Sequence, residues 1–343
     1  MLILPIAVYF IAEQLLGAEW AIVLSITFTF ISAMWSRRAC GSLNKTELIS
    51  DILLIALFGI TDIVLAKQSD GLRPLVTSLI FTAFLSLTLI PRLGLLRSLM
   101  GKINPYSLSN PYVVYLMERS AVRMVIWAII ATLLYAYAYV YPDTRAALWI
   151  SGYTIMTIMF AYVATEIIWA HVRKRKYKDC EWVQLVTADG KTCGGCPRPL
   201  VHNGSHWLHA VVHLHVVHNG RLLLQLRPKT KKIQGGKWDT AVGGHVAYGE
   251  KLPNALSREA VEEIGIRNFE ARLVARYMWH SDVEDEYVLS FIAQNGGPFA
   301  PQNVGEVDEL KFWTKDEIVA SMGKNVFTPN LEHELQQNIL NIL

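Results

Sequence analysis

The sequence predicts a chain in two parts: a polytopic α-helical membrane domain over residues 1–172 and an α/β domain over residues 181–343, joined by a basic juxtamembrane linker over 173–180. Two observations support this fold class. The hydrophobic content of 52% is high for a purely soluble enzyme, and the excess lies in the first half. The composition then changes abruptly to Arg-Lys-Arg-Lys-Tyr-Lys at 173–178, after which strand and helix patterns follow. A length of 343 residues suffices for two domains.

Apolar runs recur through the first half and predict about six transmembrane helices. Several runs reach the roughly 17 to 20 residues that a helix needs to cross a bilayer. The first run is short and contains Glu13; a cleaved signal peptide is the alternative there, but the run has no basic start and further apolar runs follow it. Six spans is the working count and five is the alternative. The runs cover residues 2–16, 19–35, 49–66, 74–90, 122–140 and 147–170.

Lys and Arg residues are distributed unequally between the two sets of connections. Twelve lie in the connections on the side of the C-terminal half, and three lie in the connections on the other side. Because cytoplasmic connections carry the excess of positive charge, we expect a multi-pass protein of the inner (plasma) membrane whose C-terminal half is cytoplasmic. Anionic head groups and this topology explain the basic run at 173–178, so we expect contact with the lipid bilayer and no nucleic-acid partner.

Among the acidic residues of the apolar runs, Asp62 and Glu166 stand out. An ionisable group in hydrocarbon tends to face a cavity or a partner. A functional or pairing role for Asp62 stays open, whereas Glu166 lies about one turn from the end of its run and can reach the interface. The topology of residues 1–172, with the loop that carries Leu95 and Arg97, is similar to that of bacterial intracellular septation membrane proteins.

The most specific pattern in the chain lies between residues 244 and 266. It consists of Gly, five residues, Glu, seven residues and then Arg-Glu-Ala-x-Glu-Glu-x-Gly-Ile. Residues 252–264 are predicted to form a helix, because Pro253 suits a first turn, an apolar stripe recurs and Gly265 suits a C-terminal stop. The fixed positions are Gly244, Glu250, Arg258, Glu259, Glu262, Glu263 and Gly265.

Three carboxylates of this predicted helix share one face. Glu259, Glu262 and Glu263 stand at positions i, i+3 and i+4, so their charges repel one another unless a cation lies between them. Mg²⁺ or Mn²⁺, which carboxylates and substrate phosphates hold together, is the natural candidate. The alternative is a solvated acidic helix face, which the fixed Gly244 and Arg258 disfavour.

This pattern resembles the Nudix box, and the resemblance extends over about residues 181–343. It implies an α/β/α sandwich with a mixed sheet between helices, divalent metal bound by the box glutamates, and hydrolysis of a diphosphate linked to another moiety. Glu263 or Glu262 is the expected general base, with Glu286 as an alternative outside the box. The structural positions of the box are Gly244, Glu250 and Gly265.

The segment before the box is predicted to be rich in strands. Strands are expected at 182–186, 210–217 and 221–227, with Asn219-Gly220 as a hairpin turn. Alternate residues of a strand share one face of the sheet, so two histidines of the second strand lie together. Half-buried polar packing is the expected role of His206, His213, His215 and His218.

A second resemblance concerns a His-x6-His pair, the Gly-His of the box and a later Glu-x-Glu. This arrangement is similar to that of type I isopentenyl-diphosphate isomerase, a Nudix relative. Three imidazoles and two carboxylates suit Mn²⁺ or Zn²⁺ as a second ion. The isomerase pattern has a cysteine where this sequence has Gly243, and the loss of that acid/base group favours hydrolysis over isomerisation. The resemblance implies metal binding by His202, His209, His245, Glu284 and Glu286.

Cations near the box are candidates for holding the diphosphate. Arg227 and Lys231 shortly precede the Gly-Gly-Lys-Trp at 235–238. The alternative role for such residues is exposed surface charge. No sequence feature identifies the leaving group as a base, a sugar or a prenyl chain. The expected substrate-binding residues are Arg198, Arg227, Lys231, Arg258 and Tyr277.

The Cys-Gly-Gly-Cys at Cys193 and Cys196 lacks a second pair of ligands at zinc-binding spacing. We therefore expect a Gly-rich turn with two thiols and assign it no ligand.

The first functional hypothesis is a membrane-anchored Nudix hydrolase that acts on a diphosphate-containing lipid or small molecule. An isopentenyl-diphosphate isomerase-like enzyme is the second, supported by the His and Glu set and opposed by Gly243. A catalytically inactive Nudix sensor that binds a ligand is the third, and the complete box argues against it. The sequence leaves the oligomeric state open.

Overall fold

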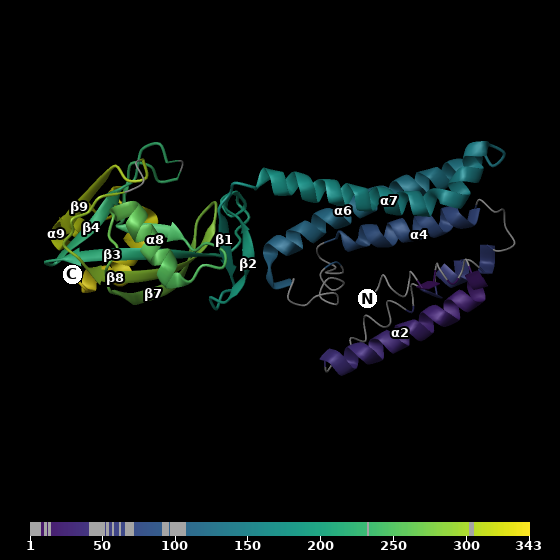
Figure 1. The fold of residues 1–343 in the computed structure, drawn as a ribbon, viewed down its shortest axis with the longest axis horizontal. Coiled ribbons are helices and arrows are strands. Elements are labelled where there is room, and N and C mark those ends of the chain that lie inside the picture. Colours follow the sequence, from purple (N-terminus) through teal and green to yellow (C-terminus); the bar gives the residue numbers. More distant parts are fainter. Residues whose placement is uncertain are drawn as a thin grey trace. The chain divides into compact units, whose positions relative to one another are not determined.

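The computed structural model describes residues 15–40, 72–90, 108–231, 233–301 and 305–343, together with scattered residues between 8 and 12, between 52 and 65, and at 96. The chain forms two compact units, Met1–Lys176 and Tyr177–Leu343. The first unit is helical and the second contains a sheet with helices (Figure 1).

The described helices of the first unit are α2 (Ala18–Cys40), α4 (Leu72–Thr88), α6 (Pro111–Val140) and α7 (Arg145–Lys176). Within this unit α4 packs against α6, and α6 packs against α7 (Figure 1). The start of α6 is defined by Asn110, whose side-chain oxygen accepts from the backbone N–H groups of Tyr112 and Val113. The helix α7 continues to Lys176, so the basic residues 173–176 form its last turn instead of belonging to the linker predicted over 173–180.

Two helices among the described residues, α6 with 30 residues and α7 with 32, are long and apolar enough to cross a membrane. The apolar stretch of α2 and the helix α4 each have fewer than the 18 residues taken as the minimum for a membrane span. The predicted span at 2–16 lies largely outside the described residues, the span at 49–66 is described only in part, and Asp62 lies outside the described residues. The described part of the chain therefore provides two helices of spanning length, compared with the six that the sequence predicts.

A polar contact joins α6 to α7 within their apolar surfaces. Nε and Nη2 of Arg123 donate to the two carboxylate oxygens of Glu166 at 2.6 and 2.8 Å. The hydroxyls of Ser120 and Tyr162, 2.8 Å apart, share a hydrogen bond one turn away. The acidic residue predicted to face a partner or the interface thus has a partner, and that partner is an arginine inside a predicted span.

The second unit contains nine strands, three α-helices and two 3₁₀ turns among its described residues. The strands are β1 (Trp182–Val186), β2 (Thr192–Pro197), β3 (His209–His218), β4 (Arg221–Leu226), β5 (Trp238–Thr240), β6 (Val242–His245), β7 (Ala271–His280), β8 (Asp285–Gln294) and β9 (Glu309–Thr314). The α-helices are α8 (Leu252–Ile264), α9 (Lys315–Ser321) and α10 (Pro329–Gln337), and η3 (Arg198–Leu200) and η4 (Ile339–Asn341) are single 3₁₀ turns.

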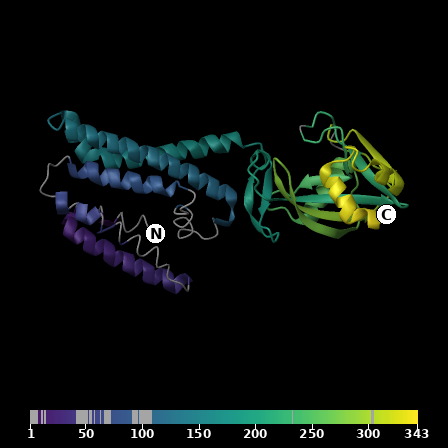
Figure 2. The same cartoon turned by 180° about the vertical axis from the view of Figure 1, so that it is seen from behind.

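The strand β3 is the centre of the sheet. It pairs in parallel with β8 along its length and antiparallel with β6, β4 and β1. The even-numbered residues of β3 enter the core cluster that includes Leu256, Ala260 and Ile264 of α8. Three odd-numbered positions of β3 are histidines, and two of these contact α10. The helices α8 and α10 therefore cover opposite faces of the sheet (Figures 1 and 2).

One local prediction is wrong: the Cys-Gly-Gly-Cys lies in the strand β2 and not in a turn, and β2 pairs antiparallel with β1. Further along the chain, β7 and β8 pair antiparallel. The helix α10 begins at Pro329, and Thr328 caps it by accepting from the N–H of Leu331.

Candidate active site

The helix α8 begins and ends where the box pattern predicts. Its C-terminal stop is Gly265, whose φ of 77° is in the left-handed region that favours glycine. A side chain at this position would also collide with the carbonyl oxygen of Ala300. Gly244 on β6 has a different reason to be glycine, because a Cβ there would overlap the carboxylate of Glu259. Gly265 thus allows α8 to end, and Gly244 allows the carboxylate of Glu259 to approach β6.

Arg258 holds the acidic groups of the box together. Its Nε and Nη2 donate to the two carboxylate oxygens of Glu250 at 3.1 and 2.9 Å, and Nη2 also donates to the carbonyl oxygen of His245 at 3.0 Å. Its Nη1 donates to Glu259 at 2.6 Å and lies 3.6 Å from a carboxylate oxygen of Glu262. Because these contacts occupy the guanidinium, the arginine predicted to bind substrate instead orients the box glutamates.

Two box carboxylates are buried at the junction of α8 and β6. Oε2 of Glu263 accepts from the backbone N–H of Gly243 at 2.8 Å and from Nε2 of Gln225 at 3.1 Å. Burial raises the pKa of Glu263 to about 8, and it raises the pKa of Glu259 to about 7 despite the nearby Arg258. Carboxylates this poorly solvated gain from a bound cation, which favours their charged form.

The second group of predicted ligands gathers on the opposite face of the sheet. The strand register places it there: His209 pairs with Glu286 across β3 and β8, and Val211 pairs with His245 across β3 and β6. Because directly paired residues and alternate residues share a face, His209, His245 and Glu286 project from one face of three adjacent strands. One donor atom from each of them lies within 4.8 Å of the others.

His202 and Glu284 complete this group. The ring centroid of His202 lies 5.8 Å from that of His209 and 5.0 Å from that of His245. Its Nδ1 contacts Oε2 of Glu284, which lies 3.8 Å from Nε2 of His209. The structure thus brings all five residues of the predicted second metal set together; we call them the His/Glu set.

The donor atoms of the His/Glu set fit a divalent ion. Nε2 of His202, His209 and His245 is buried and has no hydrogen-bond partner among the described residues. Burial lowers the pKa of His209 and lowers that of His245 well below its ordinary value, so both rings are neutral and can offer a lone pair. Burial also raises the pKa of Glu286 to about 7. Unpaired buried donors are costly unless a ligand satisfies them.

Two of the predicted cations, Arg227 and Arg198, contact other groups of the protein. Nη1 of Arg227 donates to Asp239 at 2.9 Å, and its Nη2 donates to the carbonyl oxygen of Ile233 at 3.3 Å. Nη1 of Arg198 donates to Glu181 at 2.9 Å. Lys231 lies in the loop between β4 and β5 and is half-buried. Arg227 therefore fastens this loop to β5, and its buried Nε has no hydrogen-bond partner among the described residues.

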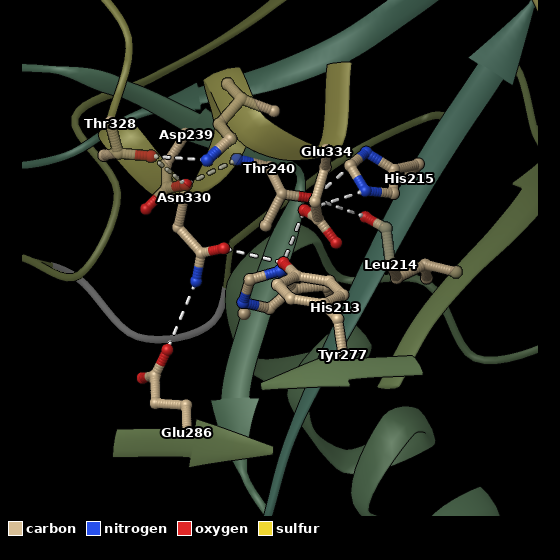
Figure 3. Close-up of polar contacts among 12 residues, drawn as sticks. His213, Leu214, His215, Asp239, Thr240, Tyr277, Glu286, Thr328, Asn330 and Glu334 are labelled. Carbon is tan, nitrogen blue, oxygen red and sulfur yellow. Dashed lines mark hydrogen bonds and ion pairs between the residues drawn. The ribbon is translucent and has the colours of Figure 1, made fainter. Parts of the chain in front are cut away.

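Sequence reasoning missed two residues of α10 that lie beside the His/Glu set. Figure 3 shows Asn330 between Tyr277 and Glu286, with Glu334 one turn further along the helix. The hydroxyl of Tyr277 donates to Oδ1 of Asn330 at 2.6 Å, and Nδ2 of Asn330 donates to Oε2 of Glu286 at 3.2 Å. Burial and the Glu334 carboxylate raise the pKa of Tyr277, so this tyrosine is a hydrogen-bond donor. The residue predicted to bind substrate thus contacts Asn330.

The buried carboxylate of Glu334 joins α10 to β3. Its Oε2 accepts from Nδ1 of His213 at 2.9 Å and from Nε2 of His215 at 3.1 Å (Figure 3). Burial opposes ionisation of Glu334, but the two histidines hold its pKa well below the ordinary value. The packing role predicted for His213 and His215 therefore includes an acidic partner. A signal was present in the sequence, because Glu334 shares a helix face with the apolar Leu331.

Comparisons with known proteins relate the second unit to one family. The NUDIX domain family matches residues 208–331. An uncharacterized Nudix hydrolase, YfcD, of Salmonella typhi is 30% identical over 161 residues, which cover 46% of this chain and 85% of the relative. An isopentenyl-diphosphate Delta-isomerase of Mycolicibacterium vanbaalenii is 36% identical over 95 residues, which cover 27% of this chain and 52% of the relative.

Among solved structures, the crystal structure of DR0079 from Deinococcus radiodurans matches with 18% sequence identity and a TM-score of 0.40, covering 46% of this chain and 98% of that one. Membership of the family rests on the sequence match to the Salmonella protein, because that match spans most of the relative's length. The chain therefore belongs to the Nudix family, and its C-terminal half is a Nudix-type hydrolase that acts on pyrophosphate bonds.

Proposed function

We propose that this protein is a membrane-anchored, divalent-metal-dependent Nudix hydrolase that cleaves the diphosphate linkage of a prenyl or other lipid diphosphate, or of a nucleoside diphosphate derivative. The observation that carries the proposal is the buried pair Glu259 and Glu263, held between the backbone of β6 and the guanidinium of Arg258. Such crowding of poorly solvated carboxylates is typical of a site for a hard cation and phosphate oxygens.

The box glutamates are the proposed ligands of Mg²⁺ or Mn²⁺. Glu259, Glu262 and Glu263 all lie on α8, and Arg258 holds the first of them in place. The ion supplies Lewis-acid stabilisation of the diphosphate oxygens when it is bound. Oε2 of Glu263 is fixed by two N–H donors, so its other oxygen faces the ion or a water. Glu263, Glu262 and Glu286 remain the candidates for the general base.

The His/Glu set is the proposed site of a second ion, Mn²⁺ or Zn²⁺. Three imidazoles and two carboxylates are a donor set that suits a borderline transition ion. The convergence of three unpartnered Nε2 atoms supports this assignment. The His/Glu set lies on the sheet face away from α8, so we assign the two ions to separate sites on the two faces of the sheet.

The membrane anchor is proposed from the helices of the first unit. The large apolar side chains of α7 are exposed: Leu148 is 72% exposed and Phe160 is 71% exposed. A helix of 32 residues with such a surface is suited to lipid and not to a soluble core. With the spans predicted from the sequence, we propose a multi-pass domain over 1–172 and a cytoplasmic Nudix domain over 181–343.

The direct test is turnover on a panel of prenyl and nucleoside diphosphates by the purified full chain in detergent and in lipid vesicles, with Mg²⁺ or Mn²⁺. Release of phosphate or of a monophosphate is expected from at least one member. Glu263→Gln should lower kcat by about 10²–10⁴-fold. Glu270→Gln, which changes an exposed glutamate, is the matched control and should keep the wild-type rate. An inactive wild type, or a fully active Glu263→Gln, would refute the proposal.

Isomerisation of isopentenyl diphosphate is the second candidate, because the His/Glu set is similar to that of the isomerases. The position that carries their cysteine is Gly243, and a Cβ there would lie 3.5 Å from Cδ2 of His213 and 3.5 Å from Cγ2 of Thr240. These are ordinary van der Waals contacts, so the backbone at this position accepts a Cβ. Deuterium exchange into isopentenyl diphosphate by the wild type would favour isomerisation. Its absence, with hydrolysis intact, would favour the hydrolase.

A further inference from the structure

We propose that Asn330 is a positioning residue that orients Glu286 toward the ion of the His/Glu set, an inference that rests on the proposed second metal site. Asn330 is the second residue of α10, and its side chain contacts Tyr277 of β7 and Glu286 of β8 (Figure 3). Its Nδ2 donates to Oε2 of Glu286 at 3.2 Å. A hydrogen bond to one oxygen of a ligating carboxylate fixes the direction in which the other oxygen points.

The orientation of the Asn330 amide is determined by a second contact. The hydroxyl of Tyr277 donates to Oδ1 of Asn330 at 2.6 Å, so the amide oxygen faces β7 and the NH₂ group faces Glu286. A carboxylate that accepts this donor at Oε2 keeps Oε1 for an ion. Glu286 is also one of the three residues whose donor atoms lie within 4.8 Å of one another. Tyr277 and Asn330 thus act through Glu286 and not on the substrate.

The helix α10, which carries Asn330, is fixed to the sheet by two contacts, one before Asn330 and one after it. At the start, Oγ1 of the capping Thr328 donates to Oδ1 of Asp239 at 2.7 Å. Four residues after Asn330, Glu334 accepts from His213 and His215 of β3. Residues at positions i and i+4 share a helix face, so the two anchors hold the Asn330 side chain against the sheet. The amide is therefore preorganised before any ion binds.

A purely structural role is the alternative: Asn330 would fasten α10 to β7 through Tyr277 and leave the metal site unaffected. The two roles predict different effects of removing the N–H donor of the Asn330 amide. A fastening role affects the stability of the fold, whereas a positioning role affects the affinity for an ion in a fold that stays intact. Metal affinity and metal-free stability must therefore be measured on the same variants.

The test is titration of the purified full chain in detergent with Co²⁺, followed by visible absorption. The signal of the His/Glu set is the part that His245→Ala abolishes. Asn330→Ala and the volume-matched Asn330→Leu should both weaken this binding by about 10–100-fold. Tyr277→Phe, which keeps the ring and removes the hydroxyl, should weaken it less. Gln336→Ala, which removes an exposed amide from the same helix, should bind as the wild type does.

Metal-free thermal unfolding separates the outcomes. We expect the Asn330 variants to keep a Tm close to that of Gln336→Ala. Wild-type affinity in Asn330→Ala, or its restoration by the leucine, would overturn the inference while leaving the metal site in place. If Asn330→Ala fails to fold, Tyr277→Phe decides, and unchanged affinity there overturns the inference. A wild type without His245-dependent Co²⁺ binding would overturn the second metal site itself and the inference with it.

Discussion

Replacing Glu334 by Gln should remove a pH-dependent contribution to the stability of the second unit. Burial alone would lower the pKa of His213, but the Glu334 carboxylate, with Glu286 and Asp239, raises it from 6.5 to about 9. A histidine whose pKa is raised in the folded state stabilises the fold fully below its unfolded pKa of 6.5. That contribution is lost as the pH rises through 9. Glu334 has a depressed pKa, so its own contribution is lost only in acid.

The magnitude follows from this rise in pKa. At about 1.4 kcal/mol for each tenfold change in a protonation equilibrium, a change from 6.5 to about 9 corresponds to about 3 kcal/mol of unfolding free energy. The side chain of His213 is 6% exposed, so solvent screens the interaction little. Between pH 6 and pH 9 the wild type should lose most of this amount, which is about a 100-fold loss of protection in a local opening equilibrium.

Hydrogen exchange of peptides from β3 and α10, read by mass spectrometry and corrected for the intrinsic rate at each pH, measures this loss independently of the helical unit. The wild type should lose protection between pH 6 and pH 9. Glu334→Gln should begin with lower protection at pH 6 and show little further loss, because His213 then lacks the carboxylate that raises its pKa. The same slope in both proteins, or stronger wild-type protection at pH 9 than at pH 6, would refute the ion pair.

Three further outcomes are expected. Arg123→Ala should destabilise the helical unit by about 1.5–3 kcal/mol, because it leaves Glu166 without its bidentate partner. A double variant that exchanges Arg123 and Glu166 should restore the melting temperature in detergent, and no recovery would argue against direct pairing. Gly265→Ala, at a φ of 77° and against a carbonyl, should destabilise the second unit by about 1–3 kcal/mol in urea unfolding, and a neutral effect would contradict the left-handed stop. Chelation by EDTA should abolish turnover, and Mn²⁺ should restore it; activity that resists chelation would contradict metal dependence.

The parts of the fold that local spacing determines could be predicted from the sequence. The helix α8 has the predicted bounds, because a proline in the first turn and a glycine stop are local signals. The grouping of His209 with His245 follows from alternation along β3 and β6, once the resemblance had singled these residues out. Pairing of β3 with β6 then places the two side chains, which lie on the same face of the sheet, next to each other.

The parts that depend on contacts between distant segments could not be predicted. Glu334 and Asn330 lie on α10, and their partners lie on strands far earlier in the chain. The pairing of Glu166 with Arg123 crosses between two helices, and an arginine inside an apolar run gave no indication of its partner. Such pairs arise from tertiary packing, which a single sequence does not encode as a spacing.

The placement of His209, His245 and Glu286 on three hydrogen-bonded neighbouring strands has a consequence for how the protein responds to its surroundings. Donors mounted on a sheet are positioned by backbone hydrogen bonds and by the core beneath them, whereas ligands on short loops commonly need the ion in order to fold. Loss of the ion should then leave the second unit folded and protected from proteolysis. An emptied site of this kind could be refilled without refolding or new synthesis of the protein.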